Sequence, residues 1–168
     1  MKFYVRAVVL LSVLIEVQVG ATSCLCPRPW VPFRDYCYRF EVKKATFKNA
    51  EKLCQSYSGE IVDSHLVSIH DSEEGTFLTM TATDIFDTSD VWIGLNDMHE
   101  EGNYTWTDGS AYEYRHFADG EPNAAITDED CIYVYLVVGT WNDSTCNDLN
   151  PFVCKRPQWQ WANNCFVD

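Results

Sequence analysis

Eight cysteines constrain the fold of this chain more than any other feature of its sequence. All of them follow an apolar leader, and they stand at Cys24, Cys26, Cys37, Cys54, Cys131, Cys146, Cys154 and Cys165. An even number of cysteines in an exported chain predicts disulfides. Their spacing alone does not choose between the pairings. Zinc is disfavoured, because the first two cysteines are too close for the usual CxxC knuckle and no matching pair of histidines follows.

The first 21 residues have the layout of a secretory signal peptide. A positive start is followed by an apolar run over residues 7–15, and Glu16 ends this run. A membrane-spanning helix needs about 20 apolar residues, so the run is too short to be one. We therefore predict cleavage after Ala21, a secreted extracellular protein and no membrane span. The remaining length allows one domain with tails.

Charge and histidine content exclude several functions. Without residues 1–21 the chain keeps 10 basic and 24 acidic residues, a net charge of −14. Such acidity argues against nucleic acid as a partner and leaves calcium or mineral contacts open. The four histidines stand in no nucleophile or hydrolase pattern, and His99-Glu100 lacks the second histidine of HExxH. The sequence therefore predicts a binding protein and no enzyme.

The spacing of apolar residues predicts two helices. One helix covers residues 47–57, with Thr46 as its cap. The other begins at Asp71, where Glu74 completes a capping box. This second helix is expected to turn Met80 toward the core.

Short strands are predicted for most of the remaining chain. They cover residues 36–40, 65–69, 91–95, 104–107, 131–138, 139–141 and 152–155. Residues 110–128 have little periodicity and several Gly, Asp, Asn and Pro residues. We predict a long ordered loop there, and long loops in compact domains are often functional.

Carboxylates and carboxamides gather in the last third of the chain. Glu121-Pro122-Asn123 and Glu129-Asp130-Cys131 come first, and Trp141-Asn142-Asp143 follows. Alone, each stretch reads as a plain turn or a strand end. Together they predict a site for calcium, a hard cation that takes about six to eight oxygen ligands. The same groups can hydrogen-bond the hydroxyls of a sugar.

With these motifs the chain resembles a C-type lectin domain over residues 26 to about 156. The resemblance runs in one order through Cys26-Pro27, Trp30, Cys37-Tyr38, residues 50–54, 65–69 and 92–95, Glu121-Pro122-Asn123, Trp141-Asn142-Asp143 and Cys154. It implies an α+β fold with two helices, two small antiparallel sheets and a long calcium-binding loop. Residues 157–168 would form a C-terminal tail.

The resemblance also implies a disulfide framework. Its pairs would be Cys54–Cys154, Cys131–Cys146 and, as in the long form of the family, Cys26–Cys37. Cys24 and Cys165 remain, and a bridge between them is geometrically reasonable. The competing expectation is an interchain bridge, which together with the tails would make a homo-oligomer.

The site that the resemblance implies holds one calcium ion as cofactor. Its metal ligands would be the side chains of Glu121, Asn123, Glu129, Asn142 and Asp143. All of these except Asp143 would also contact sugar, and Pro122 would have a cis peptide bond. The order Glu-Pro-Asn is the mannose type, so mannose, N-acetylglucosamine and fucose are the expected glycans. The galactose type reads Gln-Pro-Asp.

A second, auxiliary calcium set is suggested by the same resemblance. It comprises Asp97, Glu101, Glu129 and Asp130. Ala124 stands where an aspartate would complete it, which weakens the expected affinity.

Two sequons and two rival functions complete the expectations. Asn103 lies in a glycosylation sequon on a predicted loop. Asn142 also lies in a sequon, but a glycan there would destroy its metal role, so we predict it to be unmodified. The resemblance makes innate recognition of microbial glycans plausible. Mineral- or ice-binding and protein-binding are the alternatives, and the intact ligand set favours sugar.

Overall fold

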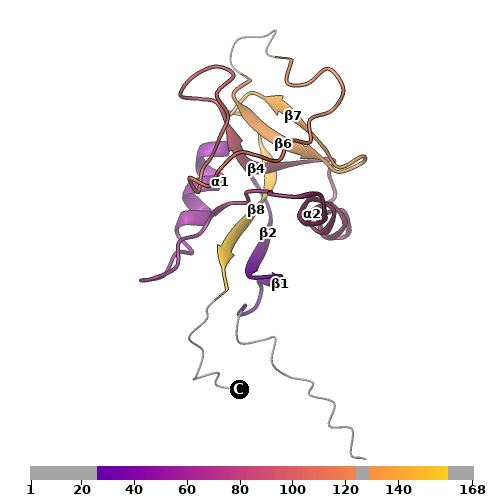
Figure 1. Ribbon diagram of the computed structural model, residues 1–168. Helices are drawn as coiled ribbons and strands as arrows, with labels where there is room; N and C mark the ends of the chain where they lie inside the picture. Colours follow the sequence, from indigo (N-terminus) through magenta and orange to yellow (C-terminus); the bar gives the residue numbers. More distant parts are fainter. Residues whose placement is uncertain (1–25, 124–128, 159–168) are drawn as a thin grey trace, which may run out of the picture.

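The computed structural model describes residues 26–123 and 129–158. They contain two helices and eight strands (Figure 1). In chain order they are β1 (Val31–Phe33), β2 (Tyr36–Ala45), α1 (Phe47–Gln55), β3 (His65–Leu66), α2 (Ser72–Ile85), β4 (Asp90–Asn96), β5 (Thr105–Trp106), β6 (Cys131–Tyr135), β7 (Thr140–Ser144) and β8 (Asn150–Pro157). Neither of the described helices has the length and apolar character needed to cross a membrane. The predicted signal peptide, Cys24 and Cys165 lie outside the described residues.

The strands form one mixed sheet instead of the two separate sheets that we expected. Its order is β1-β2-β8-β4-β6-β7, with β3 on β8 and β5 on β4. Every pairing is antiparallel except that of β4 with β8, which meet in parallel where Trp92 faces Phe152. Both side chains are fully buried. This parallel pairing joins two antiparallel groups of strands into one sheet, and the α+β class is confirmed.

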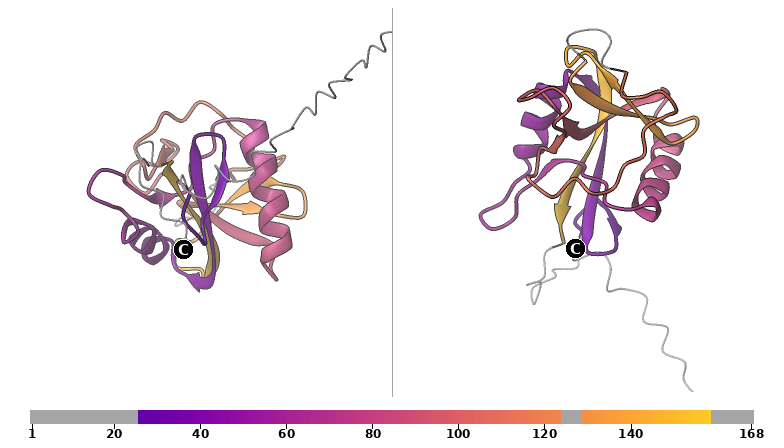
Figure 2. Two further views of the ribbon diagram at one scale, coloured as in Figure 1. Left: turned by 90° about the horizontal axis from the view of Figure 1, so that it is seen from below. Right: turned by 45° about the horizontal axis from the view of Figure 1, so that its top comes forward.

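The two helices lie on opposite sides of the sheet (Figure 2). α1 buries Phe47, Ala50 and Cys54, and the disulfide from Cys54 to Cys154 ties it to β8. Thr46 occupies the N-cap position as predicted, but its side chain makes no capping hydrogen bond. Packing and the disulfide therefore hold this helix in place without a side-chain cap.

The start of α2 was predicted correctly, and one of its core contacts was not. Asp71 caps the helix by accepting from the Glu74 backbone N–H at 2.9 Å. The inward row is Glu74, Leu78 and Ala82, whereas Met80 is 68% exposed. Two residues beyond Leu78 is about 200° around a helix, so a side chain there points to solvent.

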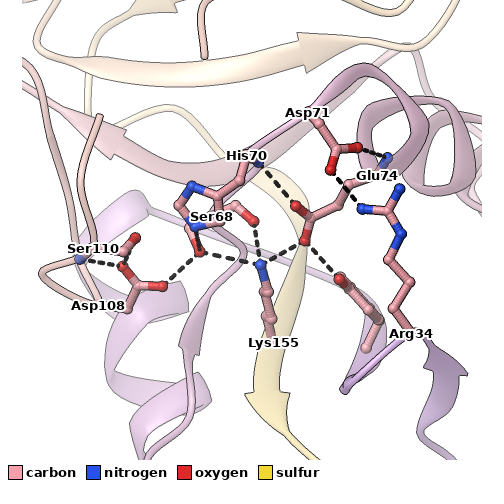
Figure 3. Close-up of polar contacts among 9 residues, drawn as sticks. Arg34, Ser68, His70, Asp71, Glu74, Asp108, Ser110 and Lys155 are labelled. Carbon is pink, nitrogen blue, oxygen red and sulfur yellow. Dashed lines mark hydrogen bonds and ion pairs between the residues drawn. The ribbon is translucent and has the colours of Figure 1, made fainter. Parts of the chain in front are cut away.

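Glu74 does not complete the predicted capping box either; its side chain enters a buried polar network (Figure 3). Its carboxylate accepts from Lys155 Nζ at 2.5 Å and from the Tyr38 hydroxyl at 2.6 Å. Lys155 also donates to the Ser68 carbonyl at 2.9 Å, and Ser68 Oγ donates to Asp108 at 2.5 Å. The network thus links α2, β8 and the turn that precedes the long loop.

Three disulfides are present in the described chain. They join Cys26 to Cys37, Cys54 to Cys154 and Cys131 to Cys146, the pairs that the resemblance implies. Tyr36 pairs with Pro157, so the first and last parts of the described chain meet at one end of the molecule. The β6–β7 hairpin and residues 118–123, the last described part of the long loop before its gap, lie at the other end (Figure 1).

Candidate functional site

The β6–β7 hairpin presents the downstream half of the expected site. β6 was predicted to run to residue 138, but it ends at Tyr135, because Gly139 adopts a positive φ of 79° and closes a turn. β7 then begins one residue later than predicted and continues through Asn142 and Asp143. The disulfide from Cys131 to Cys146 holds the open end of this hairpin.

Backbone hydrogen bonds bring the upstream half alongside β7. Residues 116–118 run alongside Trp141 of β7. The Trp141 N–H donates to the His116 carbonyl at 2.8 Å. Ala118 N–H donates back to the Trp141 carbonyl at 3.0 Å. The Glu121 N–H then closes a turn on the Ala118 carbonyl at 3.0 Å. Glu121 therefore lies at the edge of β7, the strand that carries Asn142.

Aromatic side chains fix the body of the long loop, which the sequence showed only as aperiodic. Tyr114 and Phe117 pack edge-on against the buried Trp141, with ring centroids 5.6 and 5.8 Å away. Trp106 packs against Trp141 at 5.7 Å and against Tyr112 at 6.3 Å. Such pairs favour one arrangement of the rings. The alternation of Tyr112 and Tyr114 is the sequence signal that corresponds to this packing.

Glu121, Asn142 and Asp143 come together at this edge. The Glu121–Pro122 peptide bond is cis, as expected. The Asn142 amide lies 2.8 and 2.9 Å from the two Glu121 carboxylate oxygens on one side. On its other side it lies 2.8 Å from the hydroxyl of Tyr133, a neighbour that the sequence analysis missed.

The acidic side chains of the site disfavour one another's ionisation. Burial raises the pKa of Glu121, contact with the Asp143 carboxyl raises it further, and hydrogen bonds from Asn123 oppose the shift. Burial, followed by the negative charge of Asp143, also raises the pKa of Glu129. A bound divalent cation would relieve this repulsion. The donor set, carboxylates with carboxamides, fits calcium.

The expected calcium ligands include both carboxylates and carboxamides. Within residues 26–123 and 129–158, no group of three or more His, Cys, Asp or Glu side chains is arranged to hold a metal by itself. A calcium ion would therefore depend on the amide oxygens of Asn123 and Asn142 as well. Asn123 is exposed and Asn142 half-buried.

Only some of the expected ligands of the second calcium ion lie close together in the structure. Asp97 is buried, and its Oδ2 accepts from the Gly102 N–H at 2.8 Å. Its N–H donates to the Asp130 carbonyl at 3.1 Å, so these two residues are neighbours. Asp97 Oδ1 is buried without a hydrogen-bond partner among the described residues. Glu101 is exposed on the turn that follows.

Two further features lie apart from this edge. Asn103 is exposed in the loop between β4 and β5, where it donates to Glu100 at 3.1 Å. A cavity of about 750 Å³ lies near the paired ends of the described chain, lined by residues that include Val62, His65 and Lys155. It contains none of the expected calcium ligands.

Comparison with known proteins matches one family. The profile of the family described as "Lectin C-type domain" matches residues 43–156. Echinoidin of Heliocidaris crassispina is 36% identical over 146 residues, covering 80% of this chain and 99% of that protein. The C-type lectin mannose-binding isoform of Oxyuranus scutellatus is 32% identical over 138 residues, covering 80% and 85%. The crystal structure of the C-type lectin CEL-I from Cucumaria echinata superposes with a TM-score of 0.75 and 35% identity, covering 78% of this chain and 96% of that one.

Proposed function

The chain belongs to the C-type lectin domain family, a family of binding proteins and not of enzymes, and from that premise we propose a secreted lectin that binds mannose-type glycans through calcium. One observation carries the proposal. Glu121 of the long loop meets Asn142 and Asp143, two neighbouring residues of β7, at the edge of that strand. Calcium bound there would supply positive charge and open coordination positions for two neighbouring sugar hydroxyls.

The side chains around the ion would contribute to sugar recognition through hydrogen bonds. The Glu121 and Glu129 carboxylates accept hydrogen bonds from sugar hydroxyls, while the amides of Asn123 and Asn142 donate to them. Each hydroxyl is then shared between the ion and the protein. Glu121 and Asn142 are both half-buried, which restricts where their side chains can lie.

The mannose preference rests on the order Glu121-Pro122-Asn123. In this order the acceptor precedes the donor, as in family members that prefer equatorial 3- and 4-hydroxyls. The mannose-binding isoform of Oxyuranus scutellatus supports this preference by its name. Because a single shallow site binds weakly, useful avidity would need several copies.

Affinity chromatography tests the proposal. The secreted chain should be retained on mannose-agarose in calcium and released by EDTA. The double variant E121Q/N123D reverses donor and acceptor and should move retention to galactose-agarose. H99A, an exposed residue outside the ligand set, should behave like the wild type. Flow-through of the wild type in calcium, with no heat in a calcium titration, would refute the proposal and favour a mineral, ice or protein ligand.

A second calcium ion is proposed beside the first. Asp97 supports it, because its buried Oδ1 accepts no hydrogen bond within residues 26–123 and 129–158, and a buried carboxylate oxygen without a partner is costly. Calorimetry should then give two ions per wild-type chain and one per D97N chain. A stoichiometry of one in the wild type would refute the second site and leave the first intact.

The remaining proposals concern the mature chain. Loss of residues 1–21 and a glycan on Asn103 would show in the mass and peptide map of the secreted protein. A Cys24–Cys165 bridge would appear in the same map, whereas an interchain bridge would give a dimer band without reducing agent.

A further inference from the structure

Tyr133 is a candidate for controlling the ligand set from the neighbouring strand. It lies on β6 directly opposite Asn142 on β7 in the antiparallel register. Its half-buried ring packs edge-on against Trp92, with centroids 6.3 Å apart. The ring is therefore held by the core, and its hydroxyl reaches the Asn142 amide at 2.8 Å.

The Asn142 amide fits between Tyr133 and Glu121 in two orientations. In the first, Nδ2 donates to the Tyr133 hydroxyl and Oδ1 faces the Glu121 carboxylate. The atom on that side lies 2.8 and 2.9 Å from the two Glu121 oxygens. Three acceptor oxygens that face one another without a donor repel. This arrangement is favourable only when a cation lies among them.

A half-turn of the amide removes the conflict. With Nδ2 on the side of Glu121, the amide donates to the carboxylate, and Oδ1 accepts from the Tyr133 hydroxyl at 2.8 Å. This second orientation satisfies every group without a cation. A phenolic hydroxyl both donates and accepts, so Tyr133 can serve Asn142 in either orientation.

We propose that Tyr133 is a positioning residue that hydrogen-bonds Asn142 in both amide orientations, so that the amide can turn its oxygen toward calcium without losing a partner. This role rests on the proposed function of the site. In the metal-free state the Tyr133 hydroxyl donates to Oδ1. In the loaded state it accepts from Nδ2, whose second hydrogen stays available for a sugar hydroxyl. The loaded hydrogen bond is the stronger one, because the ion polarises the amide.

Calcium affinity of the Y133F variant tests the proposal. The variant keeps the ring and its contact with Trp92 and loses only the hydroxyl. We expect about ten-fold weaker calcium binding by calorimetry, the usual effect of removing a group that orients a metal ligand. Y135F is the matched control, since Tyr135 lies on the same strand opposite Thr140 and should stay within about two-fold of wild type. A cooperative urea transition in EDTA with the same slope for all three proteins would show that the fold is unchanged.

The orientation of the amide can be observed directly. In a ¹⁵N-labelled chain, the side-chain NH₂ protons of Asn142 should show strong NOEs to the ring protons of Tyr133 in calcium and clearly weaker ones in EDTA. A purely structural role for Tyr133 would leave these NOEs the same in both conditions.

The outcomes separate this role from the function it rests on. A wild-type chain that gives no calcium heat refutes both. A wild-type chain that binds calcium refutes only the role of Tyr133 if Y133F binds equally well, or if the NOEs do not change with calcium. Weaker binding by Y133F alone, together with a calcium-dependent NOE change in the wild type, supports it.

Discussion

Replacing Lys155 by methionine removes the cation that faces Glu74 in the core. The two side chains are 4% and 5% exposed, and Nζ lies 2.5 Å from the carboxylate. Methionine occupies a similar volume, so the main effect is a buried carboxylate without a counter-charge. Breaking a buried pair in this way costs about 3–5 kcal/mol. We expect K155M to lower the free energy of unfolding by that amount.

The neighbours of Glu74 make the sign of a second substitution predictable. Tyr38 OH and His70 N–H still donate to the carboxylate in K155M, at 2.6 and 2.9 Å, but neither neutralises its charge. E74Q removes the charge and keeps a side-chain oxygen that can accept one of these hydrogen bonds. The double variant K155M/E74Q should therefore be more stable than K155M alone.

Urea unfolding with intact disulfides, followed by tryptophan fluorescence in EDTA, measures these effects. For a domain of this size a loss of about 4 kcal/mol lowers the urea midpoint by roughly 2 M. K44M, at an exposed lysine of β2, is the control and should change stability by less than about 0.5 kcal/mol. The reasoning is refuted if K155M loses less than about 1 kcal/mol, or if adding E74Q to K155M destabilises the protein further.

Three other perturbations have expected outcomes. G94A should cost about 1–3 kcal/mol in a urea titration, because its Cβ would lie 2.8 Å from the Leu66 carbonyl oxygen of β3. G59A should be nearly neutral, because its Cβ would meet no described residue within 4 Å other than its chain neighbours; equal effects of the two substitutions would contradict this. Replacing Cys131 and Cys146 by alanine should lower the free energy of unfolding by about 3 kcal/mol, the loop-closure value for their separation of 15 residues. It should also weaken calcium binding. An unchanged thermal unfolding temperature would argue against this estimate. Calcium affinity should fall between pH 7 and pH 5, because burial raises the pKa of Glu121 and a protonated carboxyl is a poor ligand; calorimetry giving one affinity at both pH values would exclude this.

Local sequence was enough to predict the start of α2, the buried run of β4 and the kinds of side chains gathered in the last third of the chain. The Asp71 cap was predicted because capping depends on residues three positions apart. The buried run of β4 was predicted from its apolar residues. The two acidic motifs could be recognised because carboxylates and carboxamides have the same ligand chemistry in any fold.

Long-range packing decided what local patterns could not. Glu74 has the right spacing for a capping box, yet its side chain pairs with Lys155, 81 residues away, because the core offers a counter-charge there. Met80 was expected inside and is exposed, because the face of α2 that packs against the core carries Glu74, Leu78 and Ala82, and Met80 lies on the opposite face.

The sequence by itself determined the family, the element order and the kinds of atoms at the site. The tertiary structure decided which of those atoms meet. Glu121 contacts Asn142 because the long loop hydrogen-bonds to the backbone of Trp141, and Tyr133 contacts Asn142 because of the register of β6 with β7. Register and loop docking depend on contacts between distant residues, and the free energy of those contacts is set by the whole core and not by any local window.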